Sequence, residues 1–140
     1  MRRFARLTLI AALAALATPA AAIEPAEGEA IRGVIGSQLE AFQADDGARA
    51  YDFAAPLIQE MFPSADRFME MVRQSYAPVY RPRSVTFGEL METPLGPAQK
   101  VYLTGPDGGD YVAVYTLERQ PDGTWKITGC FLARDTRPSV

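Results

Sequence analysis

The spacing of apolar residues changes near residue 80 from a helical period to a strand period, and this change limits the fold more than any other feature. Before it, apolar residues such as Ile31, Ile35, Leu39 and Phe42 recur every three or four positions. After it, residues 110–119 alternate and are rich in β-branched and aromatic side chains. Helices followed by strands, rather than an alternation of the two, indicate an α+β domain.

The helical half is divided by proline, glycine and capping residues. We expect three N-terminal helices, over about 27–44, over 47–54 and from Ser64 to Pro78, which stops the third. A short helical segment, 56–61, begins at Pro56 between the second and the third. These helices are expected to pack on one face of the sheet formed by the second half.

The second half predicts a curved antiparallel sheet of about four strands joined by turns that contain glycine or proline. The strands are expected over 83–92, 98–105, 110–119 and 124–134. Strict alternation places Val85, Phe87 and Met91 on one face of the first strand. In the last strand it places Trp125, Ile127, Gly129 and Phe131 on one face, and Lys126, Thr128, Cys130 and Leu132 on the other. Residues 23–134 form one domain, and 135–140 are expected to be a loose tail.

The first 22 residues have the order of charge, apolar core and small residues that is typical of a cleavable signal peptide. Arginines precede the apolar run Leu7–Leu16, and Ala20–Ala22 supplies the small residues that signal peptidase requires. The apolar run is about half of the ~20 residues that a spanning helix needs, so no stable membrane anchor is expected after cleavage. We therefore expect cleavage after Ala22 and a periplasmic or secreted protein, by general or twin-arginine export.

Charge and missing residue types exclude several functions. Loss of the leader removes three arginines and changes the net charge from −3 to −6, and an acidic domain is a poor partner for nucleic acid. The chain has no histidine, which excludes a Ser-His-Asp or Cys-His catalytic set. We expect no metal and no cofactor. Cys130 is the one cysteine, so it has no internal disulfide partner, and we expect it to be buried in the sheet core or covered by a partner.

The segments "AYDFAAPLIQEMFPSADRFMEMVRQSYAPVYRP" and "YVAVYTLERQPDGTWKITGCFL" carry a resemblance to a known group. They resemble exported bacterial domains of unknown function whose layout is similar to the nuclear-transport-factor-2-like, or ketosteroid-isomerase-like, fold. This resemblance implies a sheet wrapped by helices into a cone, often with an interior pocket and often dimeric through the sheet. Enzymes of that wider fold place an acid or base inside the cone, and this sequence departs from them.

The candidate ligand-binding residues are tyrosines expected to converge on the cone and arginines beside them. They are Tyr51, Tyr76, Tyr80, Tyr102, Tyr115, Arg73 and Arg81. Tyrosine combines apolar area with a hydroxyl, and arginine binds carboxylate or phosphate. Ordinary core packing and surface ion pairs are the alternative explanations. We assign no catalytic residue.

Three functions remain open at this stage. The leading hypothesis is non-catalytic binding of a small amphipathic ligand or a partner peptide in an aromatic-lined cone. The second is an interaction module with a solid core that forms a homodimer or contacts another envelope protein. The third, an isomerase or dehydratase, requires a carboxylate or paired tyrosines in a cavity, and Asp52 and Glu89 are the acids in question.

Overall fold

A computed structural model describes residues 22–138 and shows five helices and four strands. The helices are α1 (Pro25–Gln43), α2 (Gly47–Asp52), α3 (Pro56–Met61), α4 (Ala65–Ser75) and α5 (Ala77–Tyr80). The strands are β1 (Ser84–Thr93), β2 (Gly96–Thr104), β3 (Asp110–Arg119) and β4 (Trp125–Arg134). The strands pair antiparallel in the order β1-β2-β3-β4, which confirms the predicted α+β class.

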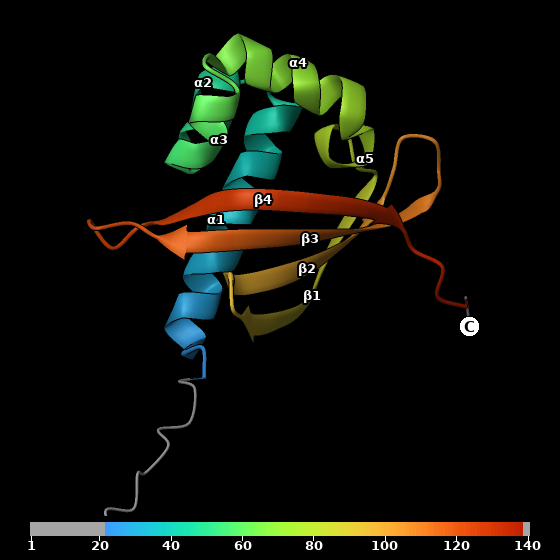
Figure 1. Cartoon of the computed structure of the whole chain (residues 1–140). Helices are drawn as coiled ribbons and strands as arrows, with labels where there is room; N and C mark the ends of the chain where they lie inside the picture. The colour runs from blue at the N-terminus through green and yellow to red at the C-terminus, as the bar shows by residue number, and fades with distance from the viewer. Residues whose placement is uncertain (1–21, 139–140) are drawn as a thin grey trace, which may run out of the picture.

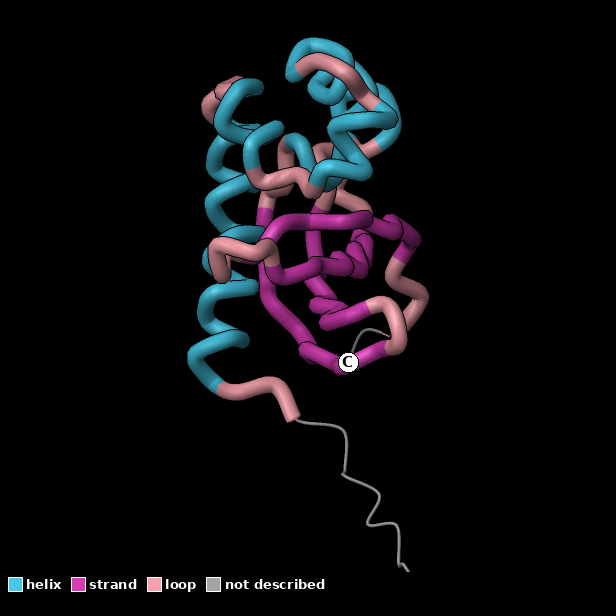
Figure 2. The backbone as a smooth tube through the Cα atoms, turned by 60° about the vertical axis from the view of Figure 1, so that its left-hand side comes forward, coloured by secondary structure: helices cyan, strands magenta, loops and turns pink. Residues whose placement is uncertain are grey.

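The curved, unclosed sheet is covered by helices on one face. Helix α1 crosses that face and buries Ile31, Ile35, Leu39 and Phe42 against it (Figure 1). Helices α2 to α5 lie together beyond the edge of the sheet that β4 forms, and the start of α1 lies on the opposite side (Figures 1 and 2). The core therefore lies between α1, the group of shorter helices and the inner face of β2, β3 and β4.

Two helices begin as their sequences predict. The side chain of Asp46 accepts a hydrogen bond from the Arg49 amide at the start of α2, and the Ser64 side chain accepts one from the Arg67 amide at the start of α4. Such caps satisfy backbone donors that a helix cannot pair internally.

The helix count differs from the prediction at Pro78. We expected Pro78 to stop the third long helix, but α4 ends at Ser75, and Pro78 lies in the first turn of the additional helix α5. The physical reason is that proline lacks the amide hydrogen that a first turn leaves unpaired, so it begins a helix as readily as it ends one.

The predicted side-chain faces of β1 are wrong beyond Phe87, because the strand contains a β-bulge. The pairing register with β2 shifts between Phe87 and Leu90, so strict alternation fails there. Leu90, instead of Met91, packs against the core, and Met91 is 40% exposed. The fully buried side chain of Gln99 stabilises this bulge, because its amide donates to the carbonyl oxygen of Gly88 at 2.9 Å.

The predicted side-chain faces of β4 are also wrong, because a second bulge interrupts its pairing with β3. The register of β3 and β4 shifts between Thr116 and Leu117, so that Ile127 pairs with Leu117. We expected Ile127 and Phe131 on the same face, but Ile127 is buried in the core and Phe131 is 70% exposed on the uncovered face. Sequence alternation alone cannot show an inserted residue of this kind.

The two ends of the chain were assigned to a leader and a loose tail. The predicted leader, apart from Ala22, lies outside the described residues. In the tail, Arg137 pairs with Asp135 at 2.8 Å, and its guanidinium carbon lies 3.9 Å from the centre of the Tyr102 ring. Over residues 22–138, no helix combines the length and hydropathy needed to cross a membrane.

Candidate functional site

A cavity of about 270 Å³ lies between the shorter helices and the inner face of β3 and β4. It is partly open to solvent, and its walls come from α1, α3, α4, α5 and the two strands. The side chains that line it are Gln38, Phe42, Ile58, Met61, Phe62, Phe68, Met71, Val72, Tyr76, Val79, Tyr115, Ile127, Thr128 and Cys130, together with Gly129. All the charged residue types are missing from this lining.

Aromatic rings pack around one side of the cavity. The ring of Phe68 on α4 lies 6.2 Å from that of Phe42, 5.6 Å from that of Tyr51 and 6.4 Å from that of Phe62, measured between ring centres. These tilted and edge-on arrangements are favourable for aromatic pairs. Phe68 thus joins α1, α2 and the end of α3 into one wall. Met61 and Met71 add flexible thioether side chains to the lining.

Four side chains with a hydroxyl or amide group line the cavity, and three of them donate hydrogen bonds within the chain. The Thr128 hydroxyl donates to the Thr116 hydroxyl at 2.9 Å. The Tyr76 hydroxyl donates to the carbonyl oxygen of Cys130 at 3.0 Å. The Gln38 amide donates to the carbonyl oxygen of Ala50 at 3.1 Å. The fourth is Tyr115, which is 1% exposed and lies beside Cys130. Within the described residues, no atom completes a hydrogen bond of ordinary geometry with its hydroxyl oxygen.

The titratable groups of the cavity are neutral at physiological pH. Burial raises the pKa of the Tyr76 hydroxyl and raises that of Tyr115 well above its usual value. Burial also raises the pKa of the Cys130 thiol from 9.0 to about 12, against a smaller lowering by its interaction with Tyr115. Desolvation disfavours the charged form of each group, so the cavity presents proton donors and no proton acceptor of basic strength.

Neither carboxylate considered for catalysis lies in the cavity. Asp52 is exposed and pairs with Lys126 at 3.7 Å, and Glu89 is exposed and pairs with Lys100 at 3.2 Å. The alternative requirement for such an enzyme was a pair of tyrosines in a cavity, and Tyr76 and Tyr115 both line this one. Their raised pKa values nevertheless leave both as neutral hydroxyls, which do not act as general bases near neutral pH.

The structure brings only two of the predicted tyrosines into the cavity, Tyr76 and Tyr115. Tyr51 lies behind the wall, where its hydroxyl donates to the carbonyl oxygen of Phe62 at 2.6 Å. In return, the Gln59 side chain donates to the carbonyl oxygen of Tyr51 at 3.1 Å, so this pair of contacts fastens α3 to α2. Tyr102 lies on the opposite face of the sheet, beneath Arg137.

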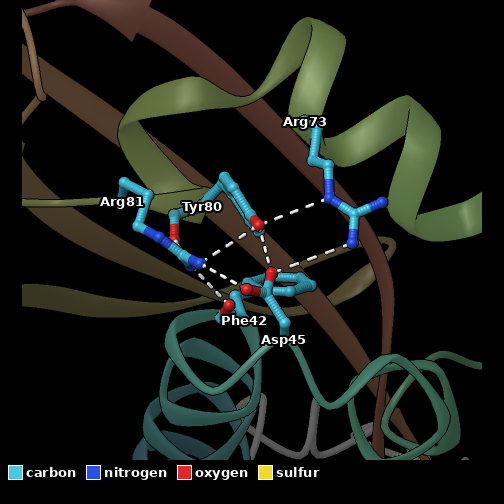
Figure 3. A network of polar contacts seen from close by, with 5 residues as sticks. All are labelled: Phe42, Asp45, Arg73, Tyr80 and Arg81. Atoms are coloured by element: carbon cyan, nitrogen blue, oxygen red, sulfur yellow. Dashed lines mark hydrogen bonds and ion pairs between the residues drawn. The ribbon is translucent and has the colours of Figure 1, made fainter.

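The remaining predicted residues form a separate cluster around Asp45 (Figure 3). The Tyr80 hydroxyl donates to the Asp45 carboxylate, which also pairs with Arg73 at 3.8 Å and with Arg81 at 2.9 Å. The Tyr80 hydroxyl and the two guanidinium groups lower the pKa of the Asp45 carboxyl. Arg81 also donates to the carbonyl oxygen of Phe42 near the end of α1. The carboxylate that these arginines hold therefore belongs to the chain itself, and the cluster ties α1 to α4 and α5.

A comparison with models of protein families identifies the family of this chain. The family model described as "Domain of unknown function (DUF4864)" matches residues 24–140. The chain belongs to this family. No curated protein matches the chain at a significant level.

Several residues that line the cavity of this DUF4864 domain were not predicted from the sequence as site residues. Phe68, Met71 and Val72 recur at helical spacing, and that spacing does not distinguish a filled core from a cavity wall. Phe62 lies just after α3, where no periodicity applies. Among residues 22–138, no group of three or more acidic or cysteine side chains is placed to hold a metal ion.

Proposed function

We propose that this DUF4864 domain is a non-catalytic binding protein that receives a small, mainly apolar molecule in the cavity between its helices and β4. The observation that carries this proposal is the cavity of about 270 Å³, lined by aromatic and aliphatic side chains and open to solvent. Small-molecule sites in proteins are concave and mostly apolar, with a few polar groups that fix orientation.

The cavity fits a molecule of modest size. A water molecule accounts for about 30 Å³ in the liquid, so the cavity has room for roughly ten non-hydrogen atoms. For an apolar molecule of that size, a dissociation constant on the order of 0.1–1 mM is expected, because small ligands gain a limited free energy per atom. A natural ligand that also uses the polar groups would bind more tightly.

The chemistry of the lining supports binding over catalysis. Acid–base catalysis near neutral pH needs a group whose pKa is close to the working pH. In the cavity, burial moves the pKa values of Tyr76, Tyr115 and Cys130 upward, away from that range. The lining also contains no carboxylate, lysine or arginine.

Methionine methyl NMR provides a direct test, with ethylbenzene as the probe. Met61 and Met71 line the cavity, whereas Met91 is on β1 and outside it. We expect saturable shifts of the Met61 and Met71 methyl resonances on titration, because the probe's ring would lie against them, and an unchanged Met91 resonance. Equal shifts at all three methyls, or none at any, would contradict the proposal.

A variant that fills the cavity provides the control for this titration. Val72 is buried in the wall, so Val72→Phe should occupy part of the space and abolish the shifts at Met61 and Met71. Met71→Trp, read at Met61, serves if Val72→Phe does not fold. The matched control is Val112→Phe on β3, outside the cavity lining, which should bind ethylbenzene like the unaltered protein. Undiminished binding by a folded, filled variant would place the probe elsewhere.

We also propose that the domain works outside the cytoplasm after removal of residues 1–22. The order of arginines, apolar run and small residues supports this. Expressed in a bacterium with its leader, the protein should be recovered from the periplasm or the medium, with an intact mass that begins at Ile23. Recovery from the cytoplasm with the leader still attached would refute export.

A further inference from the structure

Among the buried side-chain nitrogen and oxygen atoms of the described cavity lining, the Tyr115 hydroxyl oxygen is the one without a hydrogen-bond partner. Tyr115 is 1% exposed on β3 and pairs across the sheet with Cys130 on β4. A buried hydroxyl almost always has a hydrogen-bond partner, because leaving it unpaired forfeits the bonds that it made with water. An unpaired hydroxyl in a cavity wall is therefore a position at which a ligand atom would complete the site.

The neighbours of this hydroxyl determine what kind of atom it needs. The Cys130 sulfur beside it is a weak acceptor, and the thiol remains protonated because burial raises its pKa to about 12. The Tyr76 hydroxyl and the Gln38 amide already donate to backbone carbonyl oxygens. Because no described oxygen forms a hydrogen bond with the Tyr115 hydroxyl, its strong donor lacks a strong acceptor, and an oxygen acceptor on the ligand would supply one.

The absence of charged residues from the lining limits the ligand further. A carboxylate or ammonium group that entered the cavity would lose its hydration and find no ion of opposite charge among the side chains that line it. The arginines nearest in sequence, Arg73 and Arg81, are held by Asp45 in the separate cluster. An uncharged acceptor, such as a carbonyl oxygen, meets no such cost.

We infer that the cavity selects an uncharged molecule of roughly ten non-hydrogen atoms with an apolar body and a carbonyl oxygen, which accepts a hydrogen bond from Tyr115. This inference rests on the proposed function and specifies its ligand class. Ketones, aldehydes, esters and amides share the required chemistry. The apolar body would lie against Phe62, Phe68 and Met71, and the carbonyl would point toward β3.

Three probes of similar shape separate these requirements: acetophenone has a neutral acceptor, ethylbenzene has none, and benzoate is charged. Dissociation constants are measured by methionine methyl NMR for the unaltered protein, for Tyr115→Phe, which keeps the ring and removes the hydroxyl, and for the control Tyr102→Phe, which makes the same change on the other face of the sheet. We expect Tyr115→Phe to weaken acetophenone binding about 3- to 10-fold, the effect of one neutral hydrogen bond, and to leave ethylbenzene binding within about twofold. Tyr102→Phe should change both values little, and benzoate should bind at least tenfold more weakly than acetophenone.

The outcomes distinguish this inference from the function on which it rests. If ethylbenzene binds and Tyr115→Phe leaves the acetophenone constant unchanged, the carbonyl inference is wrong while the binding cavity stands. Benzoate binding as tight as that of acetophenone would also overturn it. If none of the three probes binds the unaltered protein, the proposed function fails as well.

Discussion

Phe68→Ala is expected to lower the free energy of unfolding by about 3–5 kcal/mol, the range measured for large aromatic side chains removed from cores. Phe68 is 5% exposed, and its ring packs against those of Phe42, Tyr51 and Phe62. The substitution removes apolar burial and three aromatic contacts, and it enlarges a cavity that already exists, so the surroundings have little to collapse onto. Urea denaturation measures the change.

Phe131→Ala is the matched control, because it makes the same chemical change on the uncovered face of the sheet. Phe131 is 70% exposed, and a substitution there should cost about 0.5 kcal/mol or less. Similar losses from the two variants would show that the wall built around Phe68 does not hold the helices on the sheet. A large loss at Phe131 alone would indicate that this face is buried in solution by another molecule.

Cys130 is expected to react with iodoacetamide about 1,000-fold more slowly in the native protein than in the unfolded protein at pH 8, because only the thiolate reacts. Burial raises the pKa of the native thiol from 9.0 to about 12. The native rate should then rise about tenfold for each pH unit, up to the pKa. Since the chain has one cysteine, mass spectrometry follows the reaction without ambiguity.

Protein unfolded in urea at the same pH is the control and should react at the rate of an ordinary thiol. A native rate within tenfold of that value would mean that the thiol is not desolvated against Tyr115. The sequence predicted a Cys130 buried in the core or covered by a partner. In the structure it lies on the cavity wall and is partly exposed as a residue, so slow reaction follows from its environment as well as from limited access.

The regular elements could be predicted from local patterns, whereas the irregular positions could not. The helical spacing of Ile31, Ile35 and Leu39 and the alternation in residues 110–119 identify α1 and β3 directly. The bulges in β1 and β4 depend on tertiary contacts, such as the amide of Gln99 on the Gly88 carbonyl. Each bulge inserts a residue and so reverses every inward and outward assignment beyond it.

The candidate site was predicted only in part, and for a related reason. Residue type identified tyrosine as suitable for a pocket, but the place of each hydroxyl depends on how the elements pack. Tyr76 and Tyr115 reach the cavity, whereas Tyr51 fastens α3 and Tyr102 lies across the sheet. The arginines were expected beside a ligand anion. In the structure they hold Asp45, which the sequence shows only as part of a helix-ending turn.

Intermolecular nuclear Overhauser effects between acetophenone and the protein locate the bound molecule, and so they show whether the cavity is its binding site. We expect effects from the acetophenone ring to the Met71 methyl group and the Phe62 ring, and from its acetyl methyl group to the Tyr115 ring. Effects to Met91 or Val112, outside the cavity, would contradict this expectation, as would the absence of any effect at a concentration that saturates the methionine shifts.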